Sequence, residues 1–150
     1  MDGYAAPFRV DINSSSGGLL VYVNSSIPTT RLKKLKINDD LQILPIEINL
    51  RKSKWLIIPI YKPPSVNDEY FFENLNKIFE FYSNSYENIL TLGDFNLETS
   101  MPIIDSFLKE NEFHSLYKKP TCFKSKQGSC IDLLLTKKKV LNIQKRLKLE

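Results

Sequence analysis

Hydrophobic positions along this chain follow strand-like and helix-like spacings in turn. An apolar, β-branched run after a Ser-Gly turn cluster predicts a strand over Leu19–Val23. The segment Leu41–Leu50 contains a second predicted strand, in which every second residue from Leu44 to Leu50 is apolar and defines one buried face. Pro45 places its start at an edge or a strand end. Trp55–Tyr61 is nearly all apolar, as expected for a strand covered on both faces, although Pro59 favours a bulge or an edge position.

Helical spacing occurs in two later segments. Pro63 and Pro64 end the third strand, Ser65 is expected to cap the first helix, and the apolar residues of that helix share one core-facing side: Phe71, Leu75, Ile78, Phe79 and Tyr82. A second helix is predicted to begin at residues 100–102 and to bury Ile103, Ile104, Phe107 and Leu108. Short strands are predicted over Ile89–Leu92 and Cys130–Leu135, so that strands separated by helices indicate an α/β fold.

Composition narrows the class of protein. A length of 150 residues predicts one domain, and 42% hydrophobic with 25% charged residues is typical of a globular chain. No apolar run approaches the roughly 18 residues of a membrane span, and the start lacks the features of a signal peptide, so no membrane partner is expected. Cys122 and Cys130 lack the spacing of a zinc site, which favours reduced thiols in an intracellular compartment.

Positive charge gathers in the last part of the chain. Residues 118–150 contain ten Lys or Arg against Asp132 and Glu150, a net charge of +8, so the other 117 residues carry −4 of the total +4. Basic side chains near a catalytic carboxylate suit a polyanionic substrate. A solvated face or an interaction tail explains the same charges equally well.

A polar pair that follows the predicted strand Ile89–Leu92 is the strongest candidate for chemistry. Gly93 allows a sharp turn, and Asp94 and Asn96 can both face one site while Phe95 packs away from it. A carboxylate can hold or deprotonate a water and a carboxamide can donate to a developing oxyanion, as metal-assisted phosphodiester hydrolysis requires. Asp-x-Asn is also common in ordinary turns, so the pair alone does not define an active site.

Five motifs occur in the order typical of the endonuclease/exonuclease/phosphatase superfamily. They are GGLLVYV at residues 17–23, IYKPPS at 60–65, LGDFN at 92–96, PTCF at 120–123 and SCIDLLLT at 129–136. Together they most resemble the endonuclease domain that precedes the reverse transcriptase in non-LTR retrotransposons of animals. The resemblance predicts a partial domain over residues 1–136, followed by a basic tail over 137–150 whose order the sequence leaves open.

This resemblance implies a deoxyribonuclease-like α/β/β/α sandwich that hydrolyses DNA phosphodiesters with Mg²⁺ or Mn²⁺. Asp94 would orient or deprotonate the attacking water, and Asn96 would hydrogen-bond the phosphoryl oxygens. Tyr61 resembles the family tyrosine that reaches the scissile phosphate. Asp132 resembles the carboxylate that orients a catalytic histidine, and Ser129 begins that Ser-x-x-Asp motif. DNA is the implied partner, a reverse transcriptase domain is expected in full-length members, and a DNA substrate implies access to the nucleus.

Two parts of the family pattern have no counterpart in this sequence. A strand asparagine and the metal-binding glutamate precede the region where Met1 stands, and a terminal Ser-Asp-His motif would follow Glu150. We therefore expect a fold incomplete at both ends, an unknown set of metal ligands, and a chain that is inactive by itself. The open alternatives are a non-catalytic remnant that binds nucleic acid and a phosphatase of the same superfamily.

Each candidate also has a purely structural interpretation. Tyr61 could be a strand-end aromatic residue with a hydrated hydroxyl, and Ser129 could only cap a turn. Asp132 lies in an apolar strand, and because a buried carboxylate is unfavourable unless paired, it should have a partner. Glu47 is interpreted as a cross-strand or surface residue, and His114 as an exposed histidine at the end of the second helix.

Overall fold

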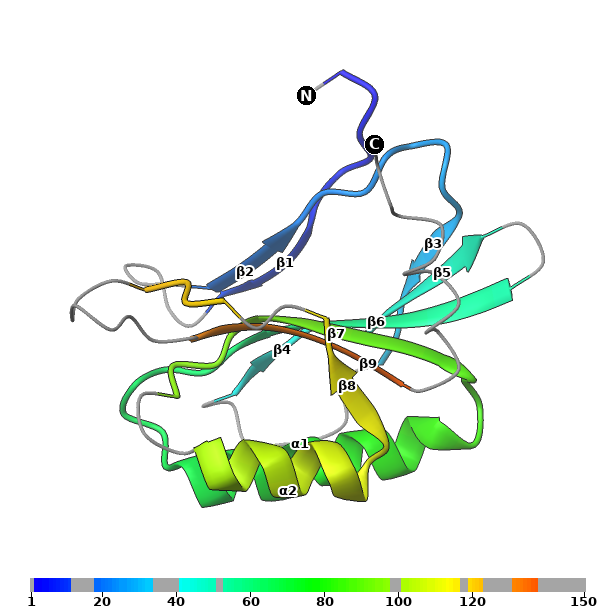
Figure 1. Ribbon diagram of the computed structural model, residues 1–150. Helices are drawn as coiled ribbons and strands as arrows, with labels where there is room; N and C mark the ends of the chain where they lie inside the picture. The colour runs from blue at the N-terminus through cyan, green and yellow to red at the C-terminus, as the bar shows by residue number, and fades with distance from the viewer. Residues whose placement is uncertain are drawn as a thin grey trace.

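Three layers make up the fold. The computed structural model describes residues 2–11, 18–33, 41–50, 53–97, 101–116, 119–122 and 131–137 of the 150-residue chain. The described residues form two helices, a seven-stranded sheet and a two-stranded sheet. In Figure 1 the helices lie below the large sheet and the small sheet lies above it. The α/β fold with two sheets that the sequence predicts is therefore confirmed.

The large sheet contains one parallel strand pair. Its strand order is β3 (Thr29–Arg31), β5 (Ile46–Leu50), β6 (Ser53–Tyr61), β7 (Asn88–Asp94), β9 (Asp132–Lys137) and β8 (Phe113–Ser115), and β4 (Gln42–Ile43) pairs with β6. β6 and β7 run parallel and are connected through α1 (Asp68–Ser83), whereas the other pairs are antiparallel. α2 (Met101–Glu110) follows β7, and β1 (Phe8–Asp11) pairs with β2 (Gly18–Val21) in the small sheet.

The predicted strand Leu41–Leu50 is divided at Pro45 into β4 and β5. Both segments keep one register with β6. Between them the N–H of Leu44 donates to the carbonyl of Pro59 at 3.1 Å, but Pro59 has no N–H with which to return the bond. The expectation that Pro59 lies at a bulge or an edge is therefore wrong, because it lies in a central strand and the interruption falls in the strand beside it.

Helix α1 begins after the predicted cap. Asn67 is the N-cap residue, and its Oδ1 accepts the N–H of Tyr70 at 3.0 Å. Ser65 lies instead in a turn in which the N–H of Val66 donates to the carbonyl of Pro63 at 3.0 Å. The prediction of Ser65 as the cap is wrong because the two prolines are followed by this turn before the helix can start.

Aromatic rings fill the space between the helices and the large sheet. Ring centroids lie 5.6, 4.8 and 4.6 Å apart in the pairs Phe71–Phe95, Phe72–Phe107 and Phe79–Phe113. The strand residues that face these rings are wholly or almost wholly buried: Leu56, Ile58, Ile60, Ile89, Leu133 and Leu135. The predicted apolar faces of both helices are therefore confirmed as the core.

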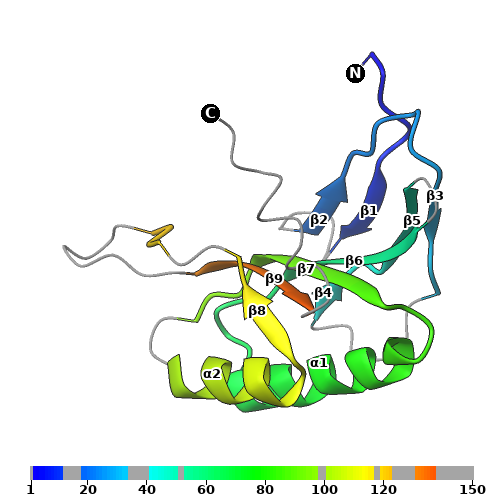
Figure 2. The same cartoon turned by 45° about the vertical axis from the view of Figure 1, so that its right-hand side comes forward.

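The small sheet covers part of the opposite face. β2 lies against β4 and β6, and β1 lies against β4 (Figure 2). Within the described ranges both helices lie on the same side of the large sheet. The second helical layer of the predicted α/β/β/α sandwich, which would cover β1 and β2, is not among these residues. Among these residues no helix is long and apolar enough to cross a membrane, and Cys122 is a free thiol, whereas Cys130 lies outside them.

Gly93 lies inside β7 and not in a turn, contrary to the expectation from the sequence. It pairs with Ile60 of β6, and its φ is 140°. A Cβ added at this position would come within 1.9 Å of the Ile60 carbonyl oxygen. The glycine is therefore required by the close approach of two parallel strands.

We predict that Gly93→Ala destabilises the fold by more than about 3 kcal/mol, the upper end of typical overpacking, because a backbone atom blocks the new Cβ. Gly3→Ala is the matched control, because Gly3 also has a positive φ, 83°, but no atom within 4 Å of an added Cβ. It should cost only the strain of a left-handed residue, about 1–2 kcal/mol. Urea unfolding of both variants measures the difference, and equal midpoints would contradict the close approach.

Candidate functional site

Three of the predicted residues meet at one end of the large sheet. Tyr61 is the last residue of β6, Asp94 is the last of β7, and Asp132 is the first of β9. The register places Tyr61 opposite Asp94 and Asp94 opposite Asp132. Residues opposite one another point to the same face of a sheet, and these three alternate with core residues, so they form one row on the face away from the helices.

The Asp94–Asn96 turn orients its own polar groups. The N–H of Asn96 donates to Oδ1 of Asp94 at 3.0 Å, and Asn96 has a positive φ of 46°, which asparagine tolerates better than most residues. Phe95 between them is 0% exposed, and its N–H donates to the carbonyl of Ile131 at 2.8 Å. Asp94 and Asn96 are half-buried, and Phe95 packs into the core, away from their polar groups, as the sequence predicts.

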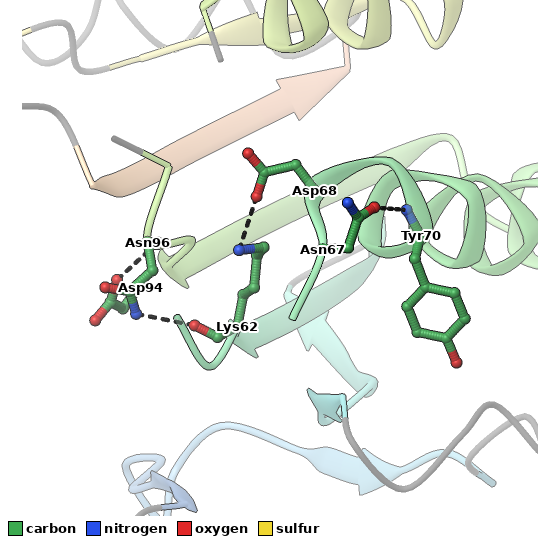
Figure 3. Close-up of polar contacts among 6 residues, drawn as sticks. All are labelled: Lys62, Asn67, Asp68, Tyr70, Asp94 and Asn96. Atoms are coloured by element: carbon green, nitrogen blue, oxygen red, sulfur yellow. Dashed lines mark hydrogen bonds and ion pairs between the residues drawn. The ribbon is translucent and has the colours of Figure 1, made fainter. Parts of the chain in front are cut away.

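Lys62 connects this turn to helix α1, and the sequence interpretation gave it no role. Its N–H donates to the carbonyl of Asp94 and its carbonyl accepts Nδ2 of Asn96, both at 2.9 Å. Its Nζ lies 2.8 Å from Oδ1 of Asp68 in the first turn of α1 (Figure 3). The available signal was a charged residue directly after an apolar strand, followed by an acidic residue at the next helix start.

Thr121 holds the start of β9. Its Oγ1 accepts the N–H groups of Ile131 and Asp132 at 3.1 and 3.0 Å. Asp132 itself is exposed, so the expectation of a buried carboxylate is wrong: it is the first residue of its strand, where the core ends. Ser129 lies outside the described residues.

The pKa of Asp94 differs from that of an isolated aspartate. Burial raises the pKa of the Asp94 carboxyl above its ordinary value, and the nearby negative charge of Asp132 raises it further. Hydrogen bonds from Asn96 and the positive charge of Lys62 oppose this rise. Asp94 therefore keeps its proton more readily than a solvated aspartate.

Glu47 has a structural role away from this row. The Tyr86 hydroxyl donates to its Oε2 at 2.6 Å and Nδ2 of Asn49 donates to its Oε1 at 3.2 Å, and these bonds lower the pKa of Glu47. Burial and the same carboxylate raise the pKa of Tyr86 to about 12. Nζ of Lys54 on the neighbouring strand lies 3.6 Å from Oε1, which agrees with the cross-strand interpretation.

His114 is not at an exposed helix end. It lies in the short strand β8, half-buried, and its Nε2 is buried with no hydrogen-bond partner among the described residues. It pairs with Thr136, four residues along β9 from Asp132, which is roughly 13 Å in a strand. Asp132 therefore cannot orient this histidine.

The described residues do not by themselves fit a divalent-metal site. They contain no group of three or more His, Cys, Asp or Glu side chains that could hold a metal ion. Asp94 and Asp132 supply two carboxylates, one half-buried and one exposed. Metal ligands consequently remain unassigned in this part of the chain.

Solved structures match this fold, whereas no protein-family model and no curated protein matches the chain. The endonuclease domain of TRAS1, a telomere-specific non-LTR retrotransposon, matches with a TM-score of 0.73 and 15% identity over 94% of this chain and 68% of that one. A mannosyl-6-phosphatase of Bacteroides thetaiotaomicron matches with a TM-score of 0.60 and 14% identity, over 92% and 64%. The human Nocturnin catalytic domain gives 0.59 and 14%, over 91% and 61%.

These matches show the fold. It is the deoxyribonuclease-like fold of the endonuclease/exonuclease/phosphatase proteins, one of which, from Bacteroides thetaiotaomicron, matches with a TM-score of 0.59. The resemblance seen in the sequence is thus confirmed at the level of the fold. The chain spans about two thirds of the length of these structures.

We predict that Asp94→Asn stabilises the protein at neutral pH, by less than about 1 kcal/mol because solvent screens a partly buried group. The folded-state pKa of Asp94 lies above the unfolded value, so the native protein loses stability as the pH rises through that interval. Asparagine has no charge to bury, and its variant should lack this loss. Urea unfolding across a pH series measures it, with exposed Asp105→Asn as the control; identical pH profiles for all three proteins would contradict the prediction.

Proposed function

We propose that this chain is part of a DNA-cleaving domain of the retrotransposon endonuclease type, which hydrolyses phosphodiesters with Mg²⁺ or Mn²⁺. The main support is the row of Tyr61, Asp94 and Asp132 beside Asn96 at the end of the sheet. Similarity to the TRAS1 endonuclease domain, with a TM-score of 0.73, favours this branch over the phosphatase at 0.60. The partners would be DNA and, in a longer polypeptide, a reverse transcriptase domain, with access to the nucleus.

The polar groups of the row and of Asn96 suit the two tasks of phosphodiester hydrolysis, which are activation of a water and stabilisation of the charge on the phosphate. Asp94 would orient the attacking water and accept its proton, for which a raised pKa is an advantage, since a stronger base removes a proton more readily. Nδ2 of Asn96 gives one hydrogen to the carbonyl of Lys62 and has a second for a phosphoryl oxygen. The hydroxyl of Tyr61 would donate to the same phosphate and stabilise the charge that develops on it.

We propose also that this chain does not complete the reaction by itself. Two neighbouring carboxylates repel an anionic phosphate, and a bound metal ion would supply the charge neutralisation that hydrolysis needs. The described residues hold no group of three or more metal-binding side chains. Loss of one positioned group typically lowers a rate on the order of 10²-fold to 10³-fold, and loss of several acting together abolishes turnover.

Two other functions are alternatives to this one. Hydrolysis of a small phosphomonoester is favoured by the match to a mannosyl-6-phosphatase, whose name places its substrate in that class. A non-catalytic remnant would instead bind nucleic acid through the basic residues of 118–150, most of which lie outside the described ranges. Binding of that kind would depend strongly on salt and not on Mg²⁺.

We predict that the chain does not nick supercoiled plasmid in the presence of Mg²⁺. The assay compares the unmodified chain with Asp94→Ala and with Asp105→Ala, an exposed aspartate on α2. Nicking by the unmodified chain and Asp105→Ala but not by Asp94→Ala would contradict the proposed inactivity and make this chain a working endonuclease. Hydrolysis of mannose 6-phosphate that Asp94→Ala abolishes would favour the phosphatase.

Binding tests the phosphate-contacting residues without requiring turnover. We predict that Tyr61→Phe weakens binding of a short DNA duplex about tenfold, the effect of one lost hydrogen bond to a charged group. Tyr22→Phe is the matched control and should bind normally, because Tyr22 is an exposed residue directly after β2 and away from the row. Titration by fluorescence anisotropy at about 0.2 M salt reduces the contribution of the basic residues, and equal affinities for the two variants would argue for the non-catalytic remnant.

A further inference from the structure

The side chain of Lys62 is buried, and a gain in folding stability does not explain why a charged residue lies there. Only 1% of its side chain is exposed, although lysine is almost never fully buried unless it is paired. Its partner is Asp68, whose side chain is 30% exposed and whose Oδ1 lies 2.8 Å from Nζ. Removing an ammonium from water is unfavourable, and replacing a buried ion pair by apolar side chains is often neutral or stabilising. A specific structural task would explain why a charged residue lies here.

That task is visible in the main chain of Lys62. Its N–H donates to the carbonyl of Asp94, and its carbonyl accepts Nδ2 of Asn96. Both ends of the Asp94–Asn96 turn are therefore attached to one residue, whose side chain is attached in turn to the start of α1 (Figure 3). A shift of Lys62 would move the carboxylate and the carboxamide together.

We infer that Lys62 is a positioning residue, an inference that rests on the proposed function. Its ion pair with Asp68 fixes the Asp94–Asn96 turn to the start of α1. The side chains of Asp94 and Asn96 are thereby oriented toward a phosphate. The ion pair is the part that a substitution can remove. Asp68 provides the second way to break it, from the other side, without creating a cavity in the core, because Asp68 is partly exposed.

One cation is among the described residues whose charges act on Asp94. Among the described groups that change the pKa of Asp94, Lys62 after β6 is the positive charge and Asp132 on β9 is the negative one. Tyr61 faces Asp94 from β6, and Asp68 on α1 is linked to it through Lys62. Loss of the charge at position 62 should therefore raise the pKa of Asp94 further.

Nuclear magnetic resonance on the full chain without DNA tests the inference. In Lys62→Met, the main chain at position 62 should shift, and its carbonyl should no longer hold the side-chain amide of Asn96. That amide should then exchange with water about tenfold faster, the effect of one lost hydrogen bond, and the Asp94 carboxyl should titrate at higher pH. Asp68→Asn should accelerate the same amide. Glu69→Gln is the matched control, because Glu69 is the other acidic residue of the first helical turn, is exposed, and has no ion pair with Lys62 among those described.

Unchanged Asn96 exchange in Lys62→Met would overturn the inference and leave Lys62 as a packing residue, even where loss of its charge raises the pKa of Asp94. If Lys62→Met does not fold, Asp68→Asn decides the question: faster exchange than in Glu69→Gln supports positioning, and equal rates overturn it. Because these measurements need neither DNA nor turnover, failure of the proposed DNA function in binding or nicking assays would be distinguishable from failure of the positioning role.

Discussion

Parallel pairing of β6 with β7 is the constraint on which the rest of the structure depends. Parallel neighbours cannot be joined by a tight turn, so the chain crosses over one face of the sheet as α1 before it returns as β7. Both strands then end at the same edge, with Tyr61 beside Asp94. β9 starts at that edge in the opposite direction and adds Asp132. Strand register alone therefore gathers three residues that are far apart in sequence.

The core supports this edge from the helical side. Phe95 separates Asp94 from Asn96 in the sequence and is inserted into the core, where its ring lies 5.6 Å from that of Phe71 on α1. Asp68, three residues before Phe71 and so on the same side of that helix, reaches Lys62. One helical turn therefore holds the Asp94–Asn96 turn twice, through an apolar contact and through an ion pair. A displacement of the first turn of α1 would therefore move the Asp94–Asn96 turn.

Helices and strands that bury a whole face were predictable from the sequence. Short strands and the burial of single side chains were not, because they depend on contacts with residues distant in the sequence. The long strands and both helices followed from apolar periodicity, and family motifs indicated Tyr61, Asp94 and Asp132, which the register brings together. β1, β3 and β8 were missed because three or four residues carry too little periodicity, and His114 was misplaced with β8. The burial of Lys62 was missed because a sequence shows a charge but not what covers it.

Gly93 illustrates a position at which no change of a neighbouring side chain can remove the clash that a substitution would create. The atom that an added Cβ would meet is the carbonyl oxygen of Ile60, which any residue at position 60 would also possess. A clash between two side chains can be relieved by shortening one of them. A clash with the main chain is relieved only if the strands separate, and that would part Tyr61 from Asp94. The spacing of β6 and β7 at this edge therefore depends on the absence of a side chain at position 93.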